Sequence, residues 1–118
     1  MIIDGIISAL ADAAAPLKLY AISTHSFSDC VIYQSYTSES DAISERVRLE
    51  VTIITSDDAA GRAVEKRIKD ALLTFGDEPF SSDVLRVVLD GGGTLEDTAR
   101  GKIHRQMYFT ILARYDGR

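Results

Sequence analysis

The sequence predicts an α+β fold, in which two helices pack on a mainly antiparallel four-stranded sheet, most simply on one of its faces. Three observations support this fold class. Two segments carry apolar residues at helical spacing, several others alternate apolar and polar residues as half-buried strands do, and the strands come in runs. The predicted order is α-β-β-α-β-β within one domain that spans residues 1–118.

The first predicted helix covers Ile2–Ala14, and Pro16 ends it. Leu17–Ser23 is compatible with a short irregular strand, which the predicted order leaves out, and Thr24–Asp29 is a polar loop. The apolar positions that define one face of the helix are Ile3, Ile6, Ile7, Leu10 and Ala14.

A strand that turns tightly into a helix, from Glu45 to Phe75, is the organising unit of the chain. Ser56 is the predicted N-cap of a helix over Asp57–Phe75, and Gly76 stands where a left-handed C-cap belongs. The alternating strand positions are Val47, Leu49, Val51 and Ile53, and the apolar stripe of the helix is Ala60, Val64, Ile68, Ala71, Leu72 and Phe75.

The other strands flank this unit. Cys30–Thr37 is rich in residues that favour an extended backbone, and the acidic segment Ser38–Ser44 is predicted to be a mobile loop before the Glu45 strand. Val84–Leu89 is apolar on both faces except at Arg86, which predicts a covered position.

The last strand runs from Ile103 to Tyr115, with Ile103, Met107, Phe109, Ile111 and Ala113 on one face. It is longer than usual, so part of it is expected to project beyond its sheet. An exposed edge on such an apolar strand invites pairing with another chain. Two explanations stay open here: symmetric assembly covers this edge, or Arg105 and Arg114 protect it.

Composition restricts the function classes. Among 118 residues, 46% are hydrophobic and 26% are charged, which is typical of a globular domain, and the formal net charge is −5. This acidic balance argues against binding to nucleic-acid phosphates. No stretch approaches the roughly 18 apolar residues of a membrane span, so we expect a soluble chain with no membrane partner.

The sequence predicts no catalytic, cofactor-binding or metal site. Asp90–Thr94 contains three glycines, but the acidic residues that follow would repel phosphate, so a flexible connection between strands is expected. His25 and His104 lack metal-ligand spacing. Cys30, the single cysteine, is predicted to be a small buried hydrophobe; a nucleophile pair with His25 is the weaker alternative.

The order and spacing of the elements resemble the small tail-terminator, or tail-completion, proteins of long-tailed bacteriophages and prophages. The segments that carry the resemblance are the helix Ile2–Ala14, the strand Cys30–Gln34, the unit Arg46–Ile53 with Asp57–Phe75, and the strand His104–Ile111. Together they cover nearly the whole chain. The resemblance rests on the pattern of elements and aromatic positions, because no catalytic motif is available to match.

This resemblance implies a virion protein of the tail or neck, made in the bacterial host cytoplasm, that has neither enzymatic activity nor a cofactor. It implies a ring, commonly of about six copies and monomeric before assembly, on the end of the tail tube. There the ring stops tube growth and meets the tail tube protein and the head-connector proteins, while DNA passes through without specific binding. A negative channel wall would repel DNA phosphates.

Contacts between subunits, or with tail and head, are expected along the Ile103–Tyr115 strand and the Ser38–Ser44 and Gly91–Arg100 loops. The predicted interface residues are Glu39, Asp41, Arg86, Glu96, Arg100, Arg105, Tyr108 and Arg114. The alternative function is a small α+β ligand-binding or regulatory module that dimerises through the same sheet edge.

Overall fold

A computed structural model describes residues 4–21, 29–40, 44–75, 78–97 and 100–114. The elements, in chain order, are α1 (Asp4–Ala14), β1 (Lys18–Ala21), β2 (Cys30–Ser40), β3 (Ser44–Thr55), α2 (Asp58–Leu72), β4 (Val84–Asp97) and β5 (Lys102–Arg114). They form one five-stranded sheet in the order β1-β2-β3-β5-β4, with every neighbouring pair antiparallel except β1 and β2.

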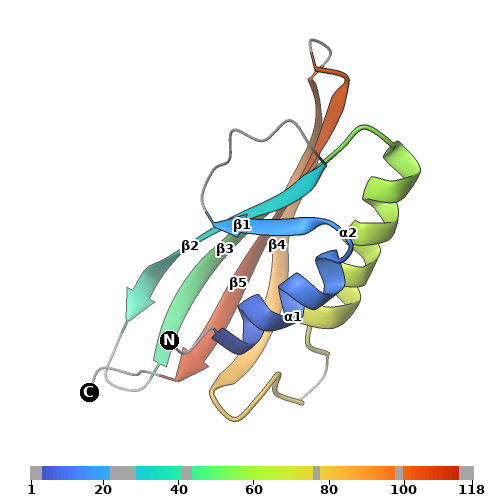
Figure 1. Ribbon diagram of the computed structural model, residues 1–118. Helices are drawn as coiled ribbons and strands as arrows, with labels where there is room; N and C mark the ends of the chain where they lie inside the picture. The colour runs from blue at the N-terminus through green and yellow to red at the C-terminus, as the bar shows by residue number, and fades with distance from the viewer. Residues whose placement is uncertain (1–3, 22–28, 41–43, 76–77, 98–99, 115–118) are drawn as a thin grey trace.

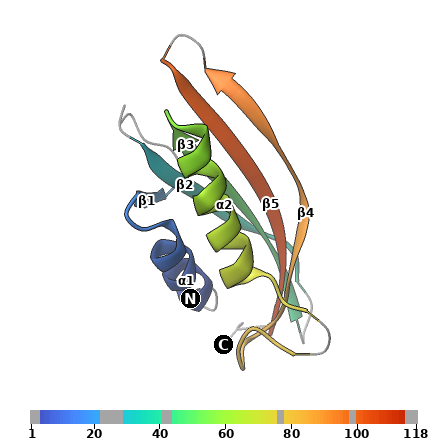
Figure 2. The ribbon, with the colours of Figure 1, turned by 90° about the vertical axis from the view of Figure 1, so that its right-hand side faces the viewer.

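Both helices lie on the same face of the sheet, as expected, and no described helix lies on the opposite face (Figures 1 and 2). The predicted alternation is confirmed, because β3 and β5 bury every second residue against the helices. This packing produces one core beneath α1 and α2. Its fully buried larger side chains include Ile6, Leu10, Val31, Leu49, Val51, Ile53, Ile68, Leu72, Met107, Phe109 and Ile111.

The sheet has five strands, so the predicted count of four is wrong, and the order of elements is α-β-β-β-α-β-β. The additional strand is β1, which pairs in parallel with β2 from Lys18 opposite Cys30 to Ala21 opposite Tyr33. Four residues are too few to show a reliable alternation, and a parallel pairing with the next strand has no turn that would reveal it.

β5 lies inside the sheet, between β3 and β4, so the prediction that it forms an exposed edge is wrong. Twelve residue pairs join β3 to β5, and β4 covers the other side of the strand. A long, strongly apolar strand is typical of such a central position. The two edges of the sheet are β1 and β4.

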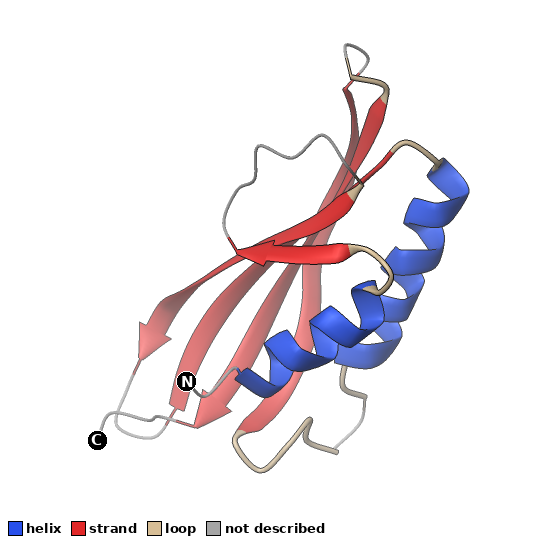
Figure 3. Ribbon diagram, viewed as in Figure 1, coloured by secondary structure: helices blue, strands red, loops and turns tan. Residues whose placement is uncertain are grey.

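β4 extends from Val84 to Asp97 and passes through the three glycines, which were predicted to end it. Register shifts between Val84 and Arg86 and between Leu89 and Gly91 allow it to follow β5 for its whole length. The expected covered position is also wrong, since Val88 and Leu89 are exposed on this edge strand. With β5, its glycine-containing half projects beyond the helices (Figure 3).

The ends of α2 differ from those predicted. Asp57 is the N-cap, and its side chain accepts a hydrogen bond from the Ala59 amide at 3.0 Å. The helix ends at Leu72, while Phe75, assigned to the apolar stripe, is 74% exposed. Gly76 lies outside the described residues.

The segment between β2 and β3 is shorter than predicted. Residues 38–40 of the expected Ser38–Ser44 loop belong to β2, and Ser44 begins β3. Residues 41–43 lie outside the described part of the chain. The antiparallel pairing of the two strands that this segment connects is confirmed.

Candidate functional site

The sheet face opposite the helices, here called the open face, carries a network of polar side chains. It includes residues of β3, β4 and β5 such as Arg48, Asp90, Tyr108 and Thr110. Asp90 accepts hydrogen bonds from Arg48, at 3.3 Å, and from Thr110. The Arg48 guanidinium also lies 5.6 Å from the centre of the Tyr108 ring, within cation–π range.

The register explains why these residues meet. Arg48 is directly opposite Thr110 on β5, and Thr110 is opposite Val88 on β4. The extra residue Asp90, at the β4 bulge, turns its carboxylate toward Thr110 on β5 and Arg48 on β3. The network is therefore a product of strand pairing, and it gives the open face a fixed pattern of polar groups that another protein surface can recognise.

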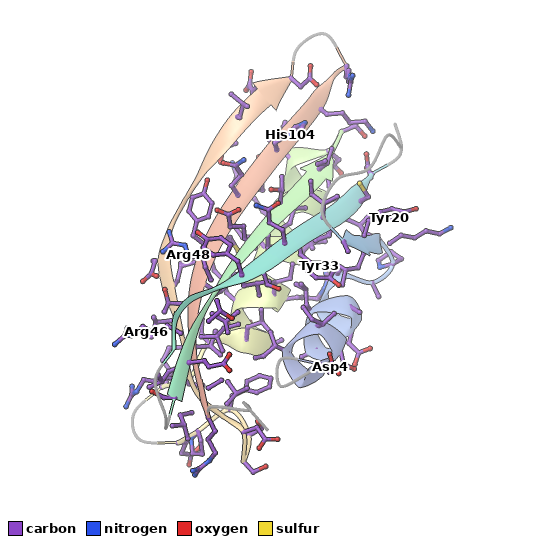
Figure 4. The ribbon with its side chains drawn as sticks, turned by 90° about the vertical axis from the view of Figure 1, so that its left-hand side faces the viewer. Asp4, Tyr20, Tyr33, Arg46, Arg48 and His104 are labelled. Atoms are coloured by element: carbon purple, nitrogen blue, oxygen red, sulfur yellow. The ribbon has the colours of Figure 1, made fainter. Side chains whose placement is uncertain are left out.

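Arginines concentrate toward the end of the open face where β3 begins and β5 ends. Arg46 and Arg86 both lie opposite Leu112, and Arg114 donates a hydrogen bond to the Ser82 carbonyl at 2.8 Å. Figure 4 shows Arg46 and Arg48 toward this end of the sheet and His104 toward the other. The two ends thus present different chemistry.

The opposite end of the sheet is held together by Asp29, which lies immediately before β2. Its carboxylate accepts hydrogen bonds from Lys102 Nζ at 2.6 Å and from Ser56, through the amide at 3.1 Å and the hydroxyl at 3.4 Å. These partners lower the pKa of Asp29, with the Lys102 hydrogen bond as the largest cause. Asp29 therefore ties the ends of β2, β3 and β5.

Replacing Asp29 with asparagine is expected to lower the free energy of unfolding near pH 7 by about 1 kcal/mol, because a partly exposed charge-assisted contact is lost. The native pKa lies below the unfolded value, so the contribution is present above the unfolded pKa and disappears as the pH falls through the native pKa. Urea unfolding of the wild-type protein and of Asp29→Asn, from pH 7 to pH 2, measures the difference in the free energy of unfolding. A difference that stays constant with pH would contradict it.

Cys30 is buried, as predicted, and burial raises the pKa of its thiol. A protonated, inaccessible thiol is a poor nucleophile. His25, its suggested partner, lies outside the described residues.

Arg105 is buried on the helix-facing side of β5, a strand inside the sheet, so the prediction that it protects an exposed edge is wrong. Its guanidinium contacts Asp58, at the start of α2, and lies 4.0 Å from a Glu65 oxygen. The side chain is 11% exposed. Arg105 instead joins α2 to the sheet, close to Gly61, where an added Cβ would meet the Thr55 hydroxyl at 2.7 Å.

A groove of about 420 Å³ lies between α2 and the glycine-containing part of β4. It is lined mainly by Glu65, Lys69, Leu89, Gly92, Thr94 and Met107. It exists because α2 packs on β3 and β5, whereas β4 extends past the helix (Figure 2). The groove therefore borders an edge strand on the helix-facing side.

The predicted interface residues fall into separate places. Glu96 and Arg100 lie exposed near the β4–β5 turn, while Arg86 and Arg114 lie exposed toward the other end of the sheet. Tyr108 is half-buried at the centre of the open face. Glu39 lies in β2, but the structure does not describe its side chain. Asp41 lies outside the described residues.

Arg48 and Asp90 are the residues that the sequence analysis missed. By its sequence alone, Arg48 is one of the polar positions between Val47 and Leu49, and Asp90 begins a glycine-rich connection. The sequence does indicate a polar face, because nearly every second residue of the β3 and β5 segments is polar. The bulge that brings Asp90 into the network has no such signal.

No family model matches the sequence, and no curated protein matches it either. Among solved structures, the fold is similar to that of a chain from the virion of a native gene transfer agent particle, with a TM-score of 0.68 and 10% sequence identity. The match covers 93% of this chain and 92% of that chain. None of the described helices has the length and apolar character needed to cross a membrane.

Proposed function

We propose that this chain is a structural protein of a phage or prophage particle that assembles as a ring at the end of the tail tube, stops tube growth and joins tail to head. The observation that carries the proposal is the fold likeness to a chain of a gene transfer agent virion over nearly the full length of both chains. The role requires neither catalysis nor a cofactor.

The placement of the exposed charges supports assembly by unlike surfaces. Glu96 pairs with Ile103 near the tip of the β4–β5 hairpin, and Arg100 lies between the two strands. The arginine-rich end of the open face, where Figure 4 shows Arg46, lies far along the same sheet. Contacts between two different surfaces repeat head to tail, and they close into a ring when the rotation between copies allows it. The molecule, 47 × 27 × 22 Å, is elongated enough to offer two well-separated surfaces.

The net charge of −5 supports a channel through which DNA slides. Arginines bind the phosphate backbone, so in this arrangement the arginine-rich end of the open face points away from the DNA. Tight, salt-sensitive binding of duplex DNA by the assembled ring would contradict this part of the proposal.

The mass of the protein in solution, with electron microscopy of any large species, is the first test. We expect closed rings of about six copies at high concentration or when tail tubes are added. Particles made without the chain are expected to have tail tubes of uncontrolled length that lack heads. Tails of normal length joined to heads would overturn the proposal, and a strict two-fold dimer would favour a dimeric binding module.

A further inference from the structure

We propose that the distal half of β4, Leu89–Asp97, binds the β1 strand of a second copy of this chain, so that the sheets of neighbouring copies join edge to edge. The inference rests on the proposed ring and names the contact that would build it. Strand addition of this kind uses backbone hydrogen bonds for affinity and neighbouring side chains for specificity.

The proximal half of β4 already has a partner along its outer edge. The Thr74 amide donates to the Val87 carbonyl at 3.1 Å, and the Val87 amide donates to the Thr74 hydroxyl at 3.1 Å. Beyond Val87, the outer edge of β4 has no backbone partner among the described residues. Within the described part of the chain, one half of this edge is therefore covered and the other half is available.

The backbone groups that face outward can be identified from the ladder. The Arg114 amide donates to the Asp83 carbonyl, which places the even-numbered residues of β5 in the positions that hydrogen-bond toward β4. Gly91 and Gly93 pair with such residues, Tyr108 and Gln106. Gly92 and Thr94 alternate with them, so their amides and carbonyls point away from the sheet.

The glycines make this edge unusually accessible. Edge strands are normally protected by charged side chains or proline, whereas Gly91, Gly92 and Gly93 have no side chain to keep another backbone away. Apolar side chains stand on either side, with Leu89 39% and Leu95 63% exposed. The groove beside α2 adds free space along the same edge.

β1 is the edge that fits. It is the opposite margin of the same sheet (Figure 2), so β4 pairing with β1 of the next copy repeats head to tail, as a ring requires. Its four residues match the length of Gly91–Thr94.

Charge favours the pairing of β4 with β1 over the pairing of β4 with β4 of another copy. The distal half of β4 carries Asp90, Glu96 and Asp97 with no basic residue, whereas β1 carries Lys18 with no acidic one. Two β4 edges side by side would bring six carboxylates into one ribbon, and like charges on neighbouring strands are destabilising.

The side of the sheet on which the β1 side chains lie also fits this pairing. Tyr20 lies opposite Ile32, on the side of the sheet away from the helices. In a joined sheet it would stand beside Gly91 or Gly93, and an aromatic neighbour compensates for a glycine in a strand.

Thr94→Pro tests the inference, with Thr94→Val as the matched control. Proline removes the outward amide of an exposed edge position without removing a hydrogen bond to β5, and valine keeps that amide. The wild-type and Val chains are expected to form rings at the same concentration. The Pro chain should need a concentration at least about 10-fold higher, since one hydrogen bond of about 1.4 kcal/mol corresponds to tenfold in affinity.

Hydrogen exchange of the wild-type protein provides the second measurement, which does not depend on the folding of a variant. The amides of Gly92 and Thr94 should exchange at least about 10-fold more slowly in the ring than in the monomer, by the same conversion. Those of Gly91 and Gly93, already bonded to β5, should change little.

Rings that form equally well with Thr94→Pro, or rings with no added protection at Gly92 and Thr94, would overturn the inference and leave the proposed function standing. A chain that stays monomeric at every concentration even with tail tubes added, or that is only a two-fold dimer, would also overturn it. Tail length in particles that lack the protein tests the proposed function separately.

Discussion

Replacing Phe109 with alanine is expected to lower the free energy of unfolding by about 3–5 kcal/mol. Phe109 is fully buried on β5, opposite Leu49 on β3 and Leu89 on β4. Truncating it removes a large apolar side chain from the centre of the sheet and leaves a cavity that neighbouring strands cannot close without losing their register. Urea unfolding of the wild-type protein and of Phe109→Ala measures the difference.

Phe75→Ala is the matched control, because it makes the same chemical change at a side chain that is 74% exposed. We expect a change within about 0.5 kcal/mol. This pair also tests where the apolar stripe of α2 ends, since the helical spacing had included Phe75. Equal losses in the two variants would contradict the burial of one and the exposure of the other.

The parts of the fold that the sequence predicted correctly are those with a strong local pattern. Val47, Leu49, Val51 and Ile53 alternate with polar residues over a full strand, and the structure buries all four. The two helices were located for the same reason. Their placement on one face followed because the strands that carry polar residues must turn those residues to solvent.

The errors concern pairings between distant segments. Nothing within the β5 segment says which strands flank it, so a long apolar strand was compatible with an edge or with the centre. β1 has only four residues, and its parallel partner β2 gives it no turn signature. The extension of β4 through the glycines depends on β5 holding it in place, which its own composition does not indicate.

The candidate interface shows a different kind of error. Alternation along the last strand places Arg105 with Met107 and Phe109, on the face that the helices cover. The alternation therefore predicts burial of Arg105, whereas its charge predicts exposure, and burial is what the structure shows. Its partner Asp58, at the start of α2, lies 47 residues away in the chain. Only the packing of α2 on the sheet makes a buried arginine acceptable there.

Gly92→Ala is expected to destabilise the fold by about 1–3 kcal/mol, the range for a small residue replaced by a larger one in a closely packed place. A Cβ built at Gly92 would overlap the Gln106 carbonyl oxygen of β5. The obstacle is backbone, so the strands themselves must move apart. We expect a lower midpoint of urea unfolding and faster hydrogen exchange along the distal half of β4.

Gly93→Ala is the control for this effect, since a Cβ at Gly93 meets no atom within 4 Å. It should leave stability unchanged or raise it by up to about 1 kcal/mol, because alanine restricts the unfolded chain more than glycine does. The two positions are adjacent and chemically identical, so only their place in the ladder distinguishes them. Tolerance of alanine at Gly92 would show that β4 does not continue along β5 past its bulge, and the edge proposed to join neighbouring copies would lose its basis.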